Sequence, residues 1–252
     1  KMIRVSILGT GNVAMHLRQL FLELKDVEVV QIVGRNTKIL QSLEERTAIT
    51  SNFEDILDAD IFIIAVNDDA IAKVSQFLKD KKGLVVHTSG SVSMDTLSQC
   101  KRYGVFYPVQ TFSKHRKVDF KSVPICVEAQ DDRDVLLLET LANKVSDAVY
   151  QVNSKQRKAL HLGAVFVNNF TNHLFHIGQQ ICEENELPTA ILQPLIQETS
   201  AKITNLSPYD AQTGPARRGD FKTIEDHLEQ LNGSEFQDVY ATMSASIEKL
   251  YR

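Results

Sequence analysis

The first half of the chain alternates short β-branched apolar runs with helical patterns, and this limits the fold most. The predicted strands are Ile3–Leu8, Val27–Val33, Ile61–Val66, Leu84–His87, Gly104–Tyr107 and Pro124–Val127, with a weaker one at Ala48–Thr50. The predicted helices are Val13–Leu24, Lys38–Arg46, Phe53–Leu57, Ala70–Leu78 and Met94–Cys100. This alternation is typical of α/β proteins, and predicts a Rossmann-type doubly wound parallel sheet.

The pattern changes after Ala148–Val152, the last predicted strand. A long helix is expected from Ser154, as N-cap, to about Glu184. Further helices are predicted at Thr189–Asn205, Thr223–Asn232 and Ser234–Leu250. We therefore expect two domains: a nucleotide-binding domain over residues 1–153 and an all-α domain for substrate binding and dimerisation over residues 154–252.

The long helix contains 24 consecutive residues, Ala159–Cys182, without Lys, Arg, Asp or Glu. A membrane span is disfavoured because the run carries several Asn and Gln side chains and three histidines. A helix without charges on any face is expected to be buried on several sides, in part against a second subunit. The sequence thus predicts a homodimer that does not enter a membrane.

Charge and cysteine content exclude several classes of protein. The 252 residues carry 28 basic and 32 acidic side chains, a net charge of −4, so nucleic acid is not an expected partner. The three cysteines are far apart and form no metal-binding motif. The apolar run after Met2 is too short for a signal sequence, so we expect a cytoplasmic protein.

The segment Gly9-Thr10-Gly11-Asn12-Val13-Ala14 follows the first predicted strand and opens a helix. In a G-x-G-x-x-A loop the first glycine permits a tight turn and the second lets the backbone approach a pyrophosphate. The small alanine lets the helix pack on the strand, and the helix N-terminus attracts phosphate. The alternative is a tight glycine turn without a ligand. Residues 9–13 are predicted to bind a dinucleotide.

The second strand ends in Gly34-Arg35-Asn36-Thr37-Lys38, without the acidic residue that usually binds the ribose of NAD. A guanidinium can bind the 2′-phosphate of NADP, so Arg35 is predicted to clamp NADP with help from Asn36, Thr37 or Lys38. The alternative is a solvated arginine in a turn. Val66 and Asn67, after the next long strand, are expected to border a ribose of the cofactor.

Several segments together resemble one family of proteins. The matching stretches are Gly9–Ala14, Ala65–Ile71, His87–Ser91, Tyr107–Phe112, the helix around His161–Asn169, and Thr213–Asp220. Members pair a Rossmann domain, similar to that of F420-dependent NADP oxidoreductases and pyrroline-5-carboxylate reductases, with a helical DUF2520 domain. The resemblance implies this fold, an NADP cofactor and a dimer formed by the helical domain.

Candidate substrate and catalytic residues come from the strand ends and from the long helix. Thr88, Ser89 and Gln110 are expected to line the pocket, Ser89 beside the cofactor; the alternative for residues 88–91 is turn and capping chemistry. At about 100° per residue, His161, Asn168 and Asn172 fall within roughly 20° of one line. Related hydroxyacid-type dehydrogenases place a basic residue and an Asn on the equivalent helix.

By that resemblance His161 is the candidate general acid or base, with Lys158 as its rival and Asn168 or Asn169 orienting the substrate. The alternative is a polar seam at an interface. Arg218, in the Thr213–Asp220 segment, is a candidate for binding an anionic group of the substrate, with Asp220 holding it in place.

The sequence therefore predicts an NADP-dependent oxidoreductase that transfers a hydride to or from a small carbonyl or imine substrate in the cleft between the domains. The alternative is an NADP-binding sensor or scaffold with little turnover. Hydride transfer to a deazaflavin is implied only by the resemblance. No metal ligand set is visible in the sequence.

Overall fold

The computed structural model describes residues 2–43, 46–114 and 116–252. The chain folds into two compact units that divide between Asn168 and Asn169, and each unit is described by itself. The predicted boundary at residue 153 marks the end of the strands, whereas the first unit also includes the helix that follows. The functional division at residue 153 stays a prediction.

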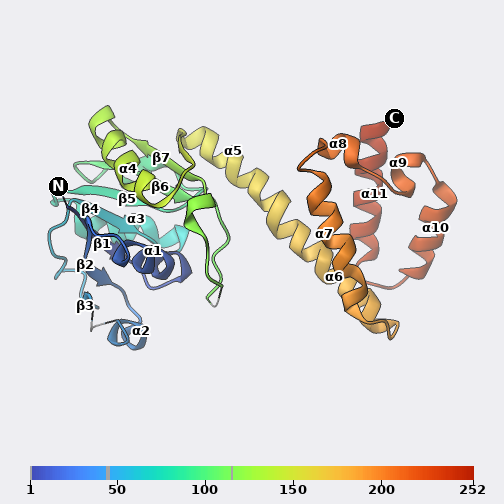
Figure 1. Ribbon diagram of the computed structural model, residues 1–252, viewed down its shortest axis with the longest axis horizontal. Helices are drawn as coiled ribbons and strands as arrows, with labels where there is room; N and C mark the ends of the chain where they lie inside the picture. The colour runs from blue at the N-terminus through green and yellow to red at the C-terminus, as the bar shows by residue number, and fades with distance from the viewer. Residues whose placement is uncertain (1, 44–45, 115) are drawn as a thin grey trace. The chain divides into compact units, whose positions relative to one another are not determined.

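The first unit contains an eight-stranded sheet with the order β3-β2-β1-β4-β5-β6-β7-β8 (Figure 1). The strands are β1 (Ile3–Leu8), β2 (Val27–Val33), β3 (Ala48–Thr50), β4 (Ile61–Ile64), β5 (Leu84–His87), β6 (Tyr103–Pro108), β7 (Ile125–Ala129) and β8 (Val149–Gln151). All neighbours pair in parallel except β6 and β7, which are antiparallel. The α/β fold with a mainly parallel sheet is confirmed.

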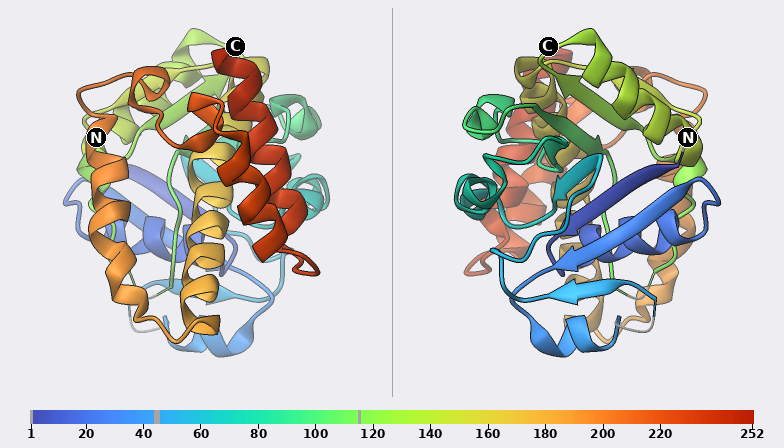
Figure 2. Two further views of the ribbon diagram at one scale, coloured as in Figure 1. Left: turned by 90° about the vertical axis from the view of Figure 1, so that its right-hand side faces the viewer. Right: turned by 90° about the vertical axis from the view of Figure 1, so that its left-hand side faces the viewer.

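Helices cover both faces of this sheet, as continuously buried strands such as β4 require. On one face α1 (Asn12–Leu22) and α4 (Asp132–Val145) share an apolar cluster with β1 and β2. On the other face α3 (Ile71–Ser75) and the 3₁₀ helix η3 (Met94–Leu97) pack on β4 and β5 (Figure 2). This layering leaves the carboxyl ends of the strands open for ligands.

Two of the predicted helices differ from the structure. Residues 53–57 form no helix, because the Asn52 side chain accepts from the amide of Glu54 and the buried Gln31 side chain bonds to the backbone of Asp55 and Leu57. The predicted helix Lys38–Arg46 is shortened to α2 (Thr37–Gln41). Its positions 44 and 45 lie outside the described residues.

The sequence interpretation missed α4, although its signals are present. The Asp131 side chain caps the helix by accepting from the amide of Asp134. Leu138, Leu141 and Val145 then follow at helical spacing and are buried against the sheet. This helix supplies much of the cover of β7 and β8.

The long helix is continuous in sequence but changes its geometry. It comprises α5 (Ser154–Ala164), a π-helical segment over Val165–Phe170, and α6 (Thr171–Glu184). Its N-cap is Asn153, in a capping box with Gln156, and not the predicted Ser154. A π turn advances by less than about 100° per residue, so the premise that aligned His161 with Asn168 and Asn172 does not hold across it.

The second unit is made of helices. They are α6, the 3₁₀ helix η6 (Thr189–Leu192), α7 (Gln193–Lys202), α8 (Pro208–Ala211), α9 (Pro215–Arg218), α10 (Phe221–Gln230) and α11 (Gln237–Tyr251). Tyr209 stacks on Tyr251 at 4.6 Å between ring centroids, which ties α8 to α11. Throughout the residues that the structure describes, no helix is long and apolar enough to cross a membrane.

All three cysteines are buried and unpaired. Cys100 and Cys126 lie in the first unit, and Cys182 lies on α6 in the second. Burial raises the pKa of Cys100 to about 11 and raises the pKa of Cys126. Both of these thiols are therefore protonated at neutral pH.

Candidate functional site

The loop between β1 and α1 has the geometry that binds pyrophosphate. Gly9 has φ of +139°, and a Cβ there would lie 2.1 Å from the carbonyl oxygen of Ala65, so only glycine fits. Gly11 is the N-cap of α1 and has no side-chain cap, and the first turn carries no acidic residue. A Cβ on Gly11 would meet nothing within 4 Å. The first amides of α1 are thus available to an anion.

A cavity of about 910 Å³ opens beside this loop. Most of the predicted cofactor residues line it: Gly9, Thr10, Gly11, Asn12, Val13, Arg35, Asn36, Val66 and Asn67, whereas Thr37, Lys38 and Ser89 do not. Thr88 and Gln110, predicted to contact the substrate, line it as well. The cavity follows the carboxyl ends of the strands, where α/β sheets bind dinucleotides. Its residues fit a dinucleotide in charge and shape.

The lining of the cavity combines cations with aromatic rings. Arg35 lies there with Lys73, from α3, and with the rings of Phe53 and Phe77, which are 5.3 Å apart between centroids. The Asn36 side-chain oxygen caps α2 by accepting from the amide of Ile39, so only its amide nitrogen is left for a ligand. Such a lining suits a planar base that carries a phosphate on its ribose.

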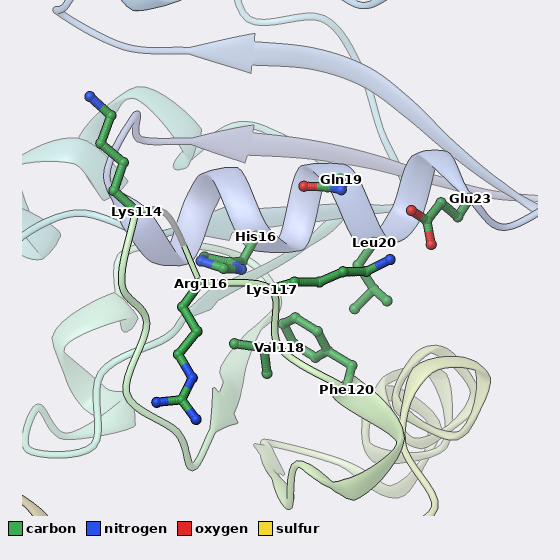
Figure 3. A pocket seen from close by; sticks show the side chains of 9 residues that line it. All are labelled: His16, Gln19, Leu20, Glu23, Lys114, Arg116, Lys117, Val118 and Phe120. Atoms are coloured by element: carbon green, nitrogen blue, oxygen red, sulfur yellow. The ribbon is translucent and has the colours of Figure 1, made fainter.

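The segment after β6 is fixed to α1 along its length. Asn12 donates to the carbonyl of Phe112 (2.9 Å), and His16 Nε2 lies 3.1 Å from the carbonyl of Ser113. Beyond these contacts lies a second cavity of about 250 Å³, bordered by His16 and by the basic side chains of Lys114, Arg116 and Lys117 (Figure 3). The anchoring holds Gln110 and Phe112 at the rim of the larger cavity.

The loop after β5 is held by its own polar side chains. His87 Nδ1 accepts from the amide of Ser89 (3.1 Å), and Ser89 Oγ accepts from the amides of Ser91 and Val92. Ser91 Oγ donates to Asp68. Burial, followed by the nearby charge of Arg157, lowers the pKa of His87 to about 4. His87 is therefore neutral at neutral pH and has a structural role. Ser89 stabilises the loop through the two hydrogen bonds that its Oγ accepts.

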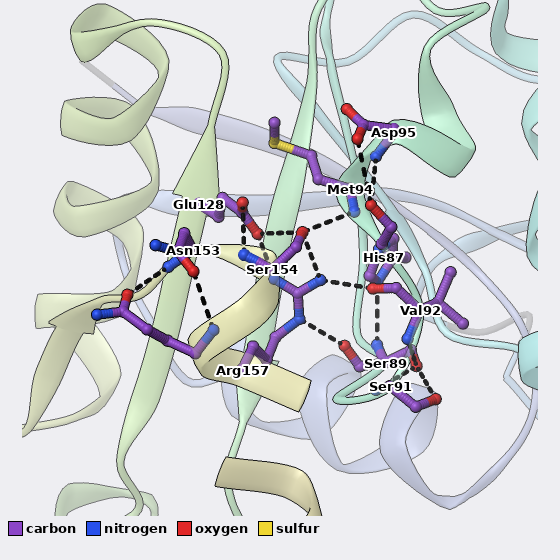
Figure 4. A network of polar contacts seen from close by, with 12 residues as sticks. His87, Ser89, Ser91, Val92, Met94, Asp95, Glu128, Asn153, Ser154 and Arg157 are labelled. Carbon is purple, nitrogen blue, oxygen red and sulfur yellow. Dashed lines mark hydrogen bonds and ion pairs between the residues drawn. The ribbon is translucent and has the colours of Figure 1, made fainter. Parts of the chain in front are cut away.

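Arg157 connects α5 to this loop (Figure 4). Its side chain is fully buried, forms an ion pair with Glu128 of β7, and donates from Nε to the carbonyl of Ser89 (3.2 Å). Nη2 donates to the carbonyl of Val92, and Ser154 Oγ donates to Glu128. The guanidinium thus ties the start of α5 to two strand ends.

Next to this anchor, His161 lies against the same loop. Tyr107 Oη is 3.2 Å from His161 Nδ1, with the ring planes at 68°. A Cβ on Gly90 would lie 2.6 Å from Nδ1 and 2.8 Å from Tyr107 Cζ, so the absence of a side chain permits this contact. Burial raises the pKa of Tyr107. The structure brings His161 to the strand ends within the first unit.

The other predicted catalytic and substrate residues are placed differently. Lys158 is exposed on α5, and Asn168 is exposed at the end of the first unit. Asn169 and Arg218 belong to the second unit and are also exposed. Asp220 caps α10 by accepting from the amide and hydroxyl of Thr223, bonds that lower its pKa. The nearby charge of Arg218 lowers the pKa of Asp220 as well, so the predicted fixing of Arg218 by Asp220 stays a prediction.

Sequence reasoning missed several residues of the site. Lys73 and Phe77 share a helical face with Asp69, a spacing that was readable in the sequence. Phe53 was assigned to a helix that does not form. Tyr107 was quoted as part of a motif but given no role, and no pattern marked Arg157 and Glu128, because their pairing is tertiary.

Comparisons with known proteins agree with this architecture. Residues 4–89 match the family described as NADP oxidoreductase, coenzyme F420-dependent, and residues 123–247 match the domain of unknown function DUF2520. BF3122 from Bacteroides fragilis, provisionally described as an NADP oxidoreductase, is 36% identical, with 98% of both chains covered and a TM-score of 0.90. The chain belongs to this DUF2520 family. No protein of curated function matches the sequence.

Two more distant structures share the fold of this DUF2520 family member. Protein TM1727 from Thermotoga maritima is 20% identical, with 98% of both chains covered and a TM-score of 0.75. An imine reductase from Myxococcus stipitatus, in complex with NADP⁺, is 14% identical, with 98% of this chain and 93% of that chain covered and a TM-score of 0.70. Among the described residues, no three His, Cys, Asp or Glu side chains form a metal site.

Proposed function

We propose that the protein is an NADP-dependent oxidoreductase that transfers a hydride between the cofactor and a small carbonyl or imine substrate. The observation that carries this proposal is the composition of the cavity lining. The lining includes the N-terminus of α1, which has no side-chain cap, and the basic side chains of Arg35 and Lys73. The imine reductase with bound NADP⁺ has the same fold and supports the choice of cofactor.

Each part of the cavity has a role in this proposal. The first amides of α1 bind the pyrophosphate, and Arg35, with Lys73 and the Asn36 amide, binds the 2′-phosphate. Val66 and Asn67 border the adenosine ribose or the nicotinamide ribose. When bound, the cofactor supplies or accepts the hydride.

The catalytic proposal concerns His161. It lies against Gly90, two residues after Thr88, which lines the cavity. An imidazole here can give a proton to the substrate heteroatom during reduction or take one during oxidation. Thr88 and Gln110 are neutral polar groups that orient the substrate. Lys158, which is exposed on the same helix, is the weaker candidate.

Thermal-shift titration with NADPH, NADP⁺, NADH and NAD⁺ tests the cofactor. A ligand at 100 times its Kd stabilises the folded state by about 2.7 kcal/mol. We expect NADPH to bind more tightly than NADH, and Arg35→Ala to abolish this preference while Arg133→Ala, an exposed arginine on α4, keeps it. Equal binding of NADH and NADPH, or an unchanged Arg35→Ala variant, would contradict the assignment.

A panel of ketoacids, aldehydes and cyclic imines then tests turnover, followed by the oxidation of NADPH. We expect His161→Gln to lower kcat by about 10²-fold or more and Lys158→Met to leave it nearly unchanged. Tight NADPH binding without turnover of any substrate would favour a sensor or scaffold instead. Loss of turnover in Lys158→Met alone would move the proton transfer to that lysine.

A further inference from the structure

The contact between Tyr107 and His161 assigns different tasks to the two imidazole nitrogens. We infer that Tyr107 is a positioning residue that occupies Nδ1 of His161 and thereby makes Nε2 the atom that exchanges a proton with the substrate. This inference rests on the proposed oxidoreductase function for its chemical meaning. The arrangement of the two nitrogens can be tested without turnover.

The first argument is geometric. Tyr107 Oη and the backbone of Gly90 occupy the Nδ1 and Cγ edge of the ring, since a Cβ on Gly90 would lie 2.6 Å from Nδ1 and 2.9 Å from Cγ. Nε2 lies across the ring from this edge. Among the described residues, Nε2 has no hydrogen-bond partner. A ligand that contacts the imidazole can therefore reach only the Nε2 side.

The second argument concerns the phenol. Tyr107 is nearly buried, and burial raises its pKa, so the hydroxyl keeps its proton at neutral pH. His161 Nδ1 is the only side-chain hydrogen-bond partner of Tyr107 in the described part of the chain. A buried hydroxyl without another acceptor donates to Nδ1, and this places the proton of the neutral imidazole on Nε2.

The third argument is that a hydroxyl can form a hydrogen bond with His161 whether the imidazole is neutral or protonated. With a neutral imidazole Oη donates to Nδ1, and with an imidazolium Oη accepts from Nδ1–H. A carboxylate at this position would only accept and would fix the proton on Nδ1. With tyrosine, Nε2 carries a proton before the transfer in both states and presents a donor to a carbonyl oxygen.

The proton step then balances as follows during carbonyl reduction. In such a reduction the carbonyl carbon would gain a C–H bond from the hydride that a bound cofactor supplies, and the C=O π pair would move to oxygen. The oxygen takes the Nε2 proton of the imidazolium, and the N–H bonding pair stays on nitrogen. This transfer leaves a neutral imidazole with its remaining proton on Nδ1, which donates to Tyr107 Oη, and a proton taken up from solvent at Nε2 restores the imidazolium.

The position of the anchor supports the assignment. Arg157 lies one helical turn before His161 on α5 and is bonded to the carbonyls of Ser89 and Val92, on either side of Gly90. The loop and the helix are thus fixed together at the level of the imidazole. His161 does not depend on the second unit for its contact with Tyr107.

¹⁵N NMR of the full-length protein labelled at histidine tests the inference, with His161 assigned by the His161→Gln variant. At a pH where the imidazole is neutral, we expect the proton on Nε2 and a hydrogen-bonded Nδ1. Tyr107→Phe should shift the Nδ1 resonance to that of a free imidazole nitrogen and increase the Nδ1–H tautomer. Tyr103→Phe, on the same strand, should change neither.

A thermal melt shows whether Tyr107→Phe is folded. If it is not, Gly90→Ala serves as the second variant, since its methyl group displaces the His161 ring from Tyr107. A proton on Nδ1 of the wild-type protein, or identical His161 spectra in wild type and Tyr107→Phe, would overturn the inference. Absence of turnover would count against the proposed function. The spectra would still decide which nitrogen of His161 carries the proton.

Discussion

Two glycines of the phosphate loop have different tasks, although both occur in the same motif. Gly9 is required by its own backbone, because of its positive φ and the close carbonyl of Ala65. Gly11 faces open space and has no such constraint. Gly9 is thus required for the fold, whereas Gly11 leaves room for the ligand.

This difference leads to a paired prediction. Gly9→Ala should reduce the free energy of unfolding by about 3 kcal/mol, since strain of this kind costs about 1–3 kcal/mol before the clash is added. Gly11→Ala should change it by less than about 0.5 kcal/mol. Gly11→Ala should nevertheless weaken NADPH binding by about tenfold or more, because its methyl group occupies the pyrophosphate site. Urea unfolding and a binding titration measure both; equal stability losses would contradict the prediction.

His87 predicts a specific pH dependence of stability. Its pKa is about 4 in the folded protein and about 6.5 when exposed, so between these values the unfolded chain binds a proton that the folded chain does not. The neutral His87 therefore does not reduce the free energy of unfolding above about pH 6.5. As the pH falls toward 4, the free energy of unfolding decreases by up to about 3 kcal/mol. His87→Gln should reduce this slope in urea unfolding, and identical slopes would refute the assignment.

At the scale of elements, Arg157 fixes α5 to the sheet. Removal of one partner of a buried ion pair costs about 3–5 kcal/mol. We therefore expect Arg157→Met to destabilise the protein by about this amount and to weaken the contact of His161 with Tyr107. Lys158→Met, one residue further and exposed, should have an effect below about 0.5 kcal/mol.

The combined variant Arg157→Met and Glu128→Leu separates charge from packing. With both charges removed, no unpaired carboxylate is left, and the loss should be smaller than for Arg157→Met alone. A double variant at least as unstable as the single one would indicate that the hydrogen bonds to Ser89 and Val92 dominate.

The elements also show what the sequence can reveal. Strands such as β1, β2 and β4 were predictable because each is a short run rich in β-branched residues and buried over most of its length. The helix expected at residues 53–57 does not form, because the side chain of Gln31, which lies far away in sequence, bonds to the backbone of Asp55 and Leu57. The alignment of His161 with Asn168 failed for a local reason, the π turn, which the apolar spacing does not reveal.

The same distinction applies to the site. The phosphate loop and Arg35 could be predicted because they follow strand ends, where topology alone brings them together. Tyr107 and Arg157 could not, because their roles depend on contacts 54 and 29 residues away in sequence. His161 was found on its chemistry and on a resemblance, and the contact that gives it a partner needed the structure.

At the scale of the whole molecule, the uncharged run remains the most unusual feature of the surface. Leu162 is 60% exposed and Val167 is 75% exposed, whereas Ile177 and Cys182 of the same run are buried. Further along, Ile191 and Leu195 are also exposed. Apolar surface of this extent favours association with a second copy.

We therefore expect a homodimer by sedimentation velocity, with Val167→Glu shifting it to monomer because the carboxylate would be buried without a partner. Lys158→Glu introduces the same charge outside the uncharged run and should leave the dimer intact. A wild-type chain that stays monomeric at every concentration measured, or a Val167→Glu variant that still dimerises, would refute this expectation.

The three buried cysteines can report how often the structure around them opens locally. A thiol reacts as its thiolate, so Cys100 and Cys126, whose pKa values are raised by burial, can be labelled only when the surrounding core opens. Cys182 is buried on α6, and its burial makes it a reporter on the second unit. With two of the three replaced by alanine, the labelling half-life of the remaining thiol measures how often its own unit opens. Each unit therefore contains a cysteine whose labelling rate reports the local opening of that unit.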